Sequence, residues 1–260
     1  MKNVIIPIDF SDTSFNAARY AAQMLAGRKD MNVILYHMFE NEEDAGTSAT
    51  YLESLKKELH SKGVANVEWV KEQGDDLIDS LSRLAYQKAS AFIIMGITGK
   101  SAIAQVLVGS NTLKLADENV CPVLIVPADA TFRGIKNVVF ASDFENVELT
   151  TPAIHLKQFL EIFKPNLHVV NVNSEQYISL TEEYEEKKAA LKSILSEYKP
   201  IFHFIRLYNV EEAINQFVED KNIDVIITVP HYHSLWSQIF GSHTKKLAYQ
   251  SHVPVLAIHE

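Results

Sequence analysis

Glycine and hydroxyl residues gather between positions 95 and 112 of the sequence. Gly96 and Gly99 directly follow a short apolar run, and Gly109-Ser110 comes after nine intervening residues. Glycine has no side chain to keep a phosphate away from the backbone, and it reaches the positive φ values that turn amide N–H groups toward one point. Ser110 and Thr112 add hydroxyl donors. The spacing predicts a phosphate-binding loop that opens a helix; the alternative is that these glycines only form turns.

A carboxylate stands where a second part of such a site would be needed. Asp9 directly follows the first apolar run of the chain, Val4 to Ile8. In an open parallel sheet, ligands bind beyond the carboxyl ends of the strands, where the strand order reverses. If the first and fourth strands are neighbours, Asp9 faces the same crevice as the glycine loop and can accept hydrogen bonds from a ribose or a base. The alternative is a helix cap, a position at which Asp is also favoured.

The elements that must hold these residues alternate along the chain. Runs rich in Val and Ile are separated by stretches with helical periodicity, which predicts an α/β fold: a parallel sheet with helices on both faces. Most runs are continuously apolar, as expected for strands buried on both faces. The predicted strands cover residues 4–8, 33–37, 67–70, 92–95 and 123–126, then 138–141, 167–172, 201–207, 225–229 and 255–258.

The second half of the chain repeats words of the first at a nearly constant offset. Asp9-Phe10 returns as Asp143-Phe144, 134 residues later, and Gly109-Ser110 returns as Gly241-Ser242, 132 residues later. A tandem duplication explains both recurrences. The predicted organisation is a first domain over residues 1–127, a linker over 128–135 and a second domain over 136–260.

The second copy departs from the first at the glycines. An offset of 132 residues places Thr228 and His231 opposite Gly96 and Gly99. A β-branched Thr, and Pro230 without an N–H, would obstruct a triphosphate, so we expect no ATP in this half. Histidines raise the alternative of a metal site, but histidines in a surface loop without a cysteine are weak evidence, and we expect no metal. These histidines are His231, His233, His243 and His252.

Composition excludes several classes of function. The formal net charge of −9 argues against a nucleic-acid partner, because Lys and Arg supply most of the affinity for a phosphate backbone. Cys121 is the only cysteine, so no intrachain disulfide can form and a reducing cytoplasm fits. The first apolar run is too short for a signal-peptide core or a membrane span. We expect a cytoplasmic protein that binds neither nucleic acid nor membrane.

The start Pro7-Ile8-Asp9-Phe10-Ser11-Asp12, together with the glycine spacing, resembles the universal stress protein family and its ATP-binding motif. The resemblance covers almost the whole chain as two tandem domains. It implies two open five-stranded parallel sheets, each in the order 3-2-1-4-5, with ATP between the first and fourth strands of the first domain. It also implies which residues surround the nucleotide: Asp9 at the adenosine, the backbone around Met38 and the side chain of Met95 at the base, and Gly96, Gly99, Gly109, Ser110, Asn111 and Thr112 at the ribose and phosphates.

The resemblance further implies pairing through the last strands, so that the two halves form an internal pseudo-dimer; a homodimer is compatible with it. We find no catalytic set in the sequence, neither a P-loop order nor a Ser-His-Asp or Cys-His arrangement. The expected function is an ATP-binding stress-response regulator, in which a magnesium ion and a water beside Asp9 or Ser110 would permit at most slow ATP hydrolysis. Two alternatives stay open: a nucleotide-activating ligase or transferase, with Lys100 as the only basic residue in the loop, and an interaction module in which nucleotide is incidental.

Overall fold

Five parallel strands form the centre of the first half of the chain. They are β1 (Lys2–Pro7), β2 (Met31–Phe39), β3 (Val67–Gln73), β4 (Ser90–Ile97) and β5 (Val123–Pro127). Their order across the sheet is β3-β2-β1-β4-β5, so that β1 pairs with β2 on one side and with β4 on the other. The chain therefore builds outward from β1 in one direction and then in the opposite direction, and the order reverses between β1 and β4.

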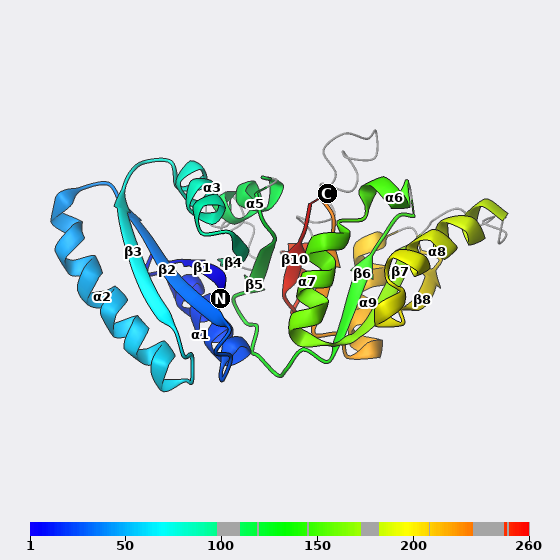
Figure 1. Cartoon of the computed structure of the whole chain (residues 1–260), viewed down its shortest axis with the longest axis horizontal. Helices are drawn as coiled ribbons and strands as arrows, with labels where there is room; N and C mark the ends of the chain where they lie inside the picture. Colours follow the sequence, from blue (N-terminus) through cyan, green and yellow to red (C-terminus); the bar gives the residue numbers. More distant parts are fainter. Residues whose placement is uncertain are drawn as a thin grey trace. The chain divides into compact units, whose positions relative to one another are not determined.

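The computed structural model describes residues 1–97, 110–118, 120–144, 146–172, 182–207, 209–230, 247–248 and 250–259, and it divides the chain into two compact units, Met1–Phe132 and Arg133–Glu260 (Figure 1). The described helices of the first unit are α1 (Asp12–Leu25), α2 (Glu42–Ser61), α3 (Leu77–Gln87) and α5 (Ser110–Asp117). α1 contacts α2, and α3 contacts α5. This pairing follows from right-handed crossovers, because connections that run in opposite directions along a sheet cover opposite faces.

Local sequence sets the ends of α1. Ser11 caps its start, with the hydroxyl oxygen accepting a hydrogen bond from the N–H of Ser14 at 3.2 Å. The helix ends just before Gly27, which has a φ of +76°, a conformation that glycine adopts without strain. Between these ends, the buried face carries small residues, Ala17, Ala18, Ala21 and Ala22, so the helix can lie close to the sheet.

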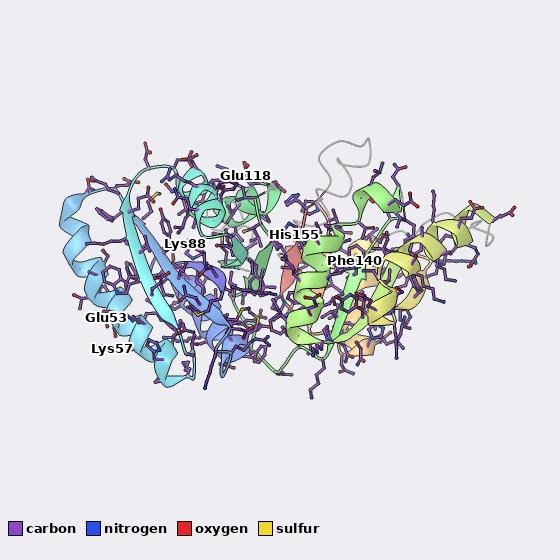
Figure 2. All side chains as sticks on the ribbon, viewed as in Figure 1. Glu53, Lys57, Lys88, Glu118, Phe140 and His155 are labelled. Carbon is purple, nitrogen blue, oxygen red and sulfur yellow. The ribbon has the colours of Figure 1, made fainter. Side chains whose placement is uncertain are left out.

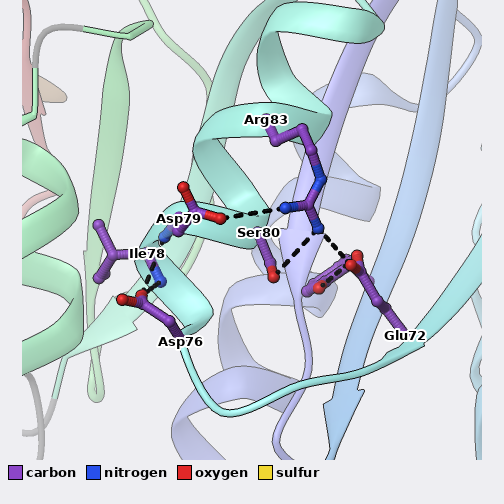
Figure 3. A network of polar contacts seen from close by, with 7 residues as sticks. Glu72, Asp76, Ile78, Asp79, Ser80 and Arg83 are labelled. Carbon is purple, nitrogen blue, oxygen red and sulfur yellow. Dashed lines mark hydrogen bonds and ion pairs between the residues drawn. The ribbon is translucent and has the colours of Figure 1, made fainter.

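A polar network holds α3 to the sheet (Figure 3). Asp76 caps the helix, because its carboxylate accepts the N–H groups of Ile78 and Asp79, each at 3.0 Å. One turn further, Arg83 donates to Asp79 at 3.0 Å and forms an ion pair with Glu72 of β3. The network ties the first turns of α3 to the carboxyl end of β3.

The second unit repeats the architecture. Its strands are β6 (Asn137–Ala141), β7 (Asn166–Val172), β8 (Ile201–Ile205), β9 (Val225–Thr228) and β10 (Val255–Ala257), and within this unit their order is β8-β7-β6-β9-β10. Its described helices are α6 (Val147–Thr150), α7 (Ala153–Phe163), α8 (Glu182–Ile194) and α9 (Val210–Lys221), with a 3₁₀ turn at Ser196–Tyr198. The predicted α/β class is confirmed, and β6 stands in the second unit where β1 stands in the first.

The duplication extends to unusual backbone conformations. Phe10 and Phe144 both have a φ of 62°, although non-glycine residues rarely adopt positive φ values. Ala89 and Asn222 are a second such pair, with φ of 46° and 50°. Each pair occupies corresponding positions in the two units, Phe10 and Phe144 after the first strand, Ala89 and Asn222 before the fourth.

One predicted helix is shorter in the structure, and one short helix was not predicted. The sequence pattern predicts one helix from Glu182 to Tyr198, but α8 ends at Ile194 and a 3₁₀ turn follows. Lys199 precedes Pro200 and has a left-handed φ of 48°, and the residue before a proline disfavours the helical conformation. The short helix α6 was not predicted, because four residues are too few to show a helical period.

Side chains divide between the interior and the surface as the pattern indicates (Figure 2). Phe140 on β6 is 1% exposed, whereas Lys57 on α2 points to solvent, since the apolar face of α2 carries Leu52, Leu55 and Leu59 inward. In the described part of the chain, no helix is both long enough and apolar enough to span a membrane.

Candidate functional site

The predicted site lies at the carboxyl edge of the first unit's sheet, between β1 and β4. These strands are neighbours, with Val4 opposite Phe92 and Ile5 opposite Ile93, as the argument for Asp9 requires. In open parallel sheets, ligands bind beyond the strand ends at such a reversal of strand order. Asp9 follows β1, Gly96 lies near the end of β4, and Ser110 opens α5.

Asp9 presents an exposed carboxylate at this edge, but it is not the helix cap. Its Oδ1 accepts hydrogen bonds from the backbone N–H and the hydroxyl of Ser11, at 3.0 Å and 2.5 Å. Partial burial raises the pKa of Asp9, but the hydrogen bonds from Ser11 outweigh this effect and lower the pKa below its usual value of 3.8. The alternative of a capping role for Asp9 is wrong, because Ser11 is the cap. Asp9 orients Ser11 and remains an ionised acceptor beyond the carboxyl end of β1.

Gly96 is a glycine for a reason that the sequence did not reveal. A Cβ atom at this position would overlap the carbonyl group of Thr13 in the first turn of α1. Close packing of α1 on β4 therefore requires a residue without a side chain at position 96, whether or not a pyrophosphate approaches. The role of Gly96 beside a phosphate stays a prediction, and the packing of α1 is a second reason for a glycine here.

Thr112 is also used within the protein. Its hydroxyl donates to the carbonyl oxygen of Gly96 at 3.0 Å, and the residue is only 3% exposed. This hydroxyl fastens α5 to the end of β4, and the expectation that Thr112 contacts a ligand stays a prediction. Asn111, next to it, is exposed at the start of the same helix. Gly99 and Gly109 lie outside the described residues, as does the side chain of Ser110.

Met38 and Met95 lie on the same face of the sheet. Ile34 and Ile93 both pair with Ile5, and paired residues of parallel strands share a face. Side chains alternate along each strand, so Met95, two residues beyond Ile93, and Met38, four beyond Ile34, remain on that face. Gly96 points to the opposite face, toward α1, which agrees with its contact with Thr13. Met95 is 7% exposed, so only a small part of its surface is open to a ligand.

A pocket of about 320 Å³ opens where β2 ends and α2 begins. Met38 lines it together with residues that the sequence did not single out as site residues, among them Phe10, His37, Glu40 and Tyr51. The Phe10 ring lies 4.5 Å from the His37 ring and 5.5 Å from the Tyr51 ring, centre to centre. The one signal for this cluster in the sequence was the recurrence of Asp9-Phe10 as Asp143-Phe144.

The second unit differs at the corresponding edge. Thr228, which corresponds to Gly96 in the repeat, is buried at the end of β9, and Pro230 is buried beyond it. His231, His233 and His243 fall outside the described residues. Within the part of the chain that is described, no three His, Cys, Asp or Glu residues gather in a way that could hold a metal ion.

The order β3-β2-β1-β4-β5, with its reversal between β1 and β4, places the first unit among the doubly wound α/β folds. The model of the universal stress protein family matches residues 1–127 and 165–259 of the chain. The chain therefore belongs to the universal stress protein family, and the family match falls in two segments, as a tandem protein requires.

Individual relatives agree with this assignment. A universal stress protein of Methanocaldococcus jannaschii is 27% identical over 139 residues, which are 48% of this chain and 81% of that protein. Among solved structures, a universal stress protein from Archaeoglobus fulgidus matches with a TM-score of 0.76 at 18% identity, over 99% of this chain and 98% of that chain.

The same fold also occurs in a different setting. The cytoplasmic domain of a prokaryotic cation chloride cotransporter matches with a TM-score of 0.59 at 9% identity, over 100% of this chain and 95% of that chain. Likeness at this level shows the fold alone, so the function has to be argued from the residues of the site.

Proposed function

We propose that this member of a stress-response family binds ATP in its first unit, at the carboxyl edge of β1 and β4, and acts as a regulator that responds to the nucleotide. The observation that carries the proposal is the position of Asp9. An exposed carboxylate with a lowered pKa lies at the reversal point of the sheet, where ribose hydroxyls can donate to it.

The start of α5 supports the placement of the phosphates. This helix begins at Ser110, next to the end of β4, and Thr112 fixes it there through the carbonyl of Gly96. The free N–H groups and the positive dipole end of a helix attract anions. A magnesium ion that accompanies the triphosphate would take its ligands mainly from phosphate oxygens and water.

The proposal is of binding and signalling. Asp9 lies two residues beyond the end of β1, and its Oδ1 already accepts hydrogen bonds from Ser11. A carboxylate held in this way suits an acceptor for ribose hydroxyls better than a general base. Slow hydrolysis of ATP is compatible with this role. Formation of AMP and pyrophosphate in the presence of ATP would instead place the chain among nucleotide-activating enzymes.

The repeat supplies a matched pair of variants for the test. Gly109→Val puts a side chain in the proposed phosphate path, and Gly241→Val makes the same change at the corresponding position of the second half. Titration calorimetry with Mg-ATP should show binding to the unmodified chain and to Gly241→Val, and none to Gly109→Val. Unchanged affinity in Gly109→Val would overturn the proposal.

A further inference from the structure

Strand β8 is the outer strand of the second unit's sheet. β7 pairs with one of its edges, and no described strand pairs with the other. Its five residues, Ile201–Ile205, include no Asp, Glu, Lys or Arg; each keeps some exposed surface, and Ile201 is 50% exposed. An apolar edge with unpaired N–H and C=O groups is a template for pairing with another chain.

The corresponding strand of the first unit, β3, protects its outer edge with charges. Glu68, Lys71 and Glu72 lie on it, and charged side chains on an edge strand discourage pairing with another sheet. Ion pairs with Lys88 and Arg83 hold the two carboxylates in place. The sequence of β8 contains no such protection.

The backbone of β7 shows which residues of β8 face outward. The N–H and C=O of one residue point to the same side of a strand, and those of the next residue point to the other side. Asn166 donates its N–H to Lys136, and Val170 accepts from Ser142, so the even-numbered residues of β7 bond toward β6. The odd-numbered residues of β7 therefore bond to β8.

Val169 is one of these odd-numbered residues, and it lies opposite Phe202. In a parallel pair, a residue bonds to the two residues that flank the one opposite it, here Ile201 and His203. The N–H and C=O groups of Phe202 and Phe204 therefore point away from β7, to the free edge.

The side chains of β8 read the same in both directions, Ile-Phe-His-Phe-Ile. If β8 pairs antiparallel with a copy of itself about His203, Ile201 lies opposite Ile205 of the partner subunit, and Phe202 lies opposite Phe204 of the partner subunit. Apolar and aromatic cross-strand pairs stabilise a sheet. Burial lowers the pKa of His203, so the two imidazoles at the axis are neutral at pH 7. The contact is then identical on both sides of a two-fold axis, the symmetry of the commonest homo-oligomers.

The free backbone groups select the same register. Hydrogen-bonded and non-hydrogen-bonded residue pairs alternate along an antiparallel ladder. With His203 at the axis, Phe202 and Phe204 form the hydrogen-bonded pairs, and both use the groups that point away from β7. A shift of two residues, the smallest that keeps these groups aligned, would place Ile201 opposite His203 of the partner subunit and end the match of side chains.

We propose that β8 is an interface with a second copy of this chain, in which two β8 strands pair antiparallel about His203 and join the sheets of two second units. A partner of different sequence could use the same backbone groups, but a second copy matches the palindrome residue by residue. The surface differs from the last strand of the unit, β10, which lies at the opposite edge of the unit's sheet.

A cysteine at the axis tests the pairing directly. The Cα atoms of a non-hydrogen-bonded antiparallel pair are about 4.5 Å apart, within the range for a disulfide. The full chain carrying His203→Cys should therefore form a covalent dimer under mild oxidation, seen on a non-reducing gel. Val70→Cys is the matched control, because Val70 lies opposite Tyr36 in β3 as His203 lies opposite Val170 in β8, and it should stay monomeric. Cys121 is buried and should not react.

Sedimentation of the full chain over a range of concentrations tests the register. Ile201→Lys should raise the dissociation constant of the dimer by about tenfold or more, because a symmetric interface contains the substitution twice. Ile154→Lys is the control, since Ile154 on α7 is 72% exposed, and it should leave self-association unchanged. Adding Ile205→Glu to Ile201→Lys places opposite charges face to face across the axis and should restore the dimer.

A chain that stays monomeric at every concentration, or a dimer that Ile201→Lys does not weaken, would overturn the inference. Cross-linking of Val70→Cys as readily as His203→Cys would do so too. If circular dichroism shows that His203→Cys does not fold, the sedimentation comparison alone decides. None of these measurements uses nucleotide, so their outcome is independent of the proposed function.

Discussion

At the scale of single residues, the carbonyl group of Thr13 occupies the space in which a side chain at position 96 would begin. Gly96→Ala should therefore lower the free energy of unfolding by about 1–3 kcal/mol, the usual cost of overpacking. Gly46→Ala is the control, because a Cβ there meets no atom within 4 Å and an alanine in helix α2 should stabilise by about 0.5–1 kcal/mol. Urea denaturation without nucleotide measures both, and equal stability of Gly96→Ala and the unmodified chain would contradict the packing argument.

A site residue was predictable where its position next to a single strand determines its location in the fold. Asp9 could be placed because a carboxylate directly after a buried strand must lie at the strand's carboxyl end. His37 and Tyr51 could not, because their relation to Phe10 exists only once β2 and α2 have packed together. The sequence likewise did not show that the hydroxyl of Thr112 bonds to the carbonyl of Gly96, because this contact forms only when α5 packs beside β4.

At the scale of secondary-structure elements, two imidazoles join β7 and β8 in the second unit. Nδ1 of His168 lies 2.9 Å from Nε2 of His203, and Phe217 of α9 packs edge-on against both rings. Burial lowers the pKa of each histidine below its usual 6.5, and the charge of Lys221 adds to the effect. Only one proton can lie between the two nitrogens, so protonating both rings would place two donors face to face.

This pair predicts an acid-sensitive second unit. Because the pKa values are lower in the folded state, the unfolded state binds protons more readily. Stability is therefore fully present above about pH 6.5 and falls as the pH drops toward the lowered pKa values, by at most about 1.4 kcal/mol per pH unit for each imidazole. The double variant His168→Gln, His203→Gln should lose less stability over this window. Denaturation curves of both proteins from pH 8 to pH 5 measure the difference, and parallel decline would rule out the pair as the cause.

Elements were predictable where burial imposes a continuous pattern. Most strands of both units appear as continuous apolar runs, and their bounds in the structure differ from those predicted by two residues or fewer, except that β3 extends three residues further than predicted. The end of α8 was not predicted because the residues after Ile194 still fit a helical pattern. The constraint from Pro200 acts on the backbone before it, and a pattern of side-chain types does not show it.

At the scale of the whole molecule, the chain consists of two units of one family plan that have diverged at the ligand edge. Both units carry a carboxylate after their first strand, Asp9 and Asp143, but the first unit has Gly96 near the end of its fourth strand, whereas the second has Thr228 and, beyond it, Pro230, both buried. Pairing of the units through their last strands, and pairing of two chains, stay predictions. Sedimentation of the full chain with and without ATP would determine whether it forms a homodimer.

Divergence of the two units makes the nucleotide stoichiometry the decisive quantity. Native mass spectrometry of the intact chain, purified and then supplied with Mg-ATP, counts bound nucleotides for each molecule. One ATP per chain, lost on Gly109→Val, is the predicted result. No bound nucleotide at saturating ATP, or two per chain, would contradict the assignment of a single site to the first unit.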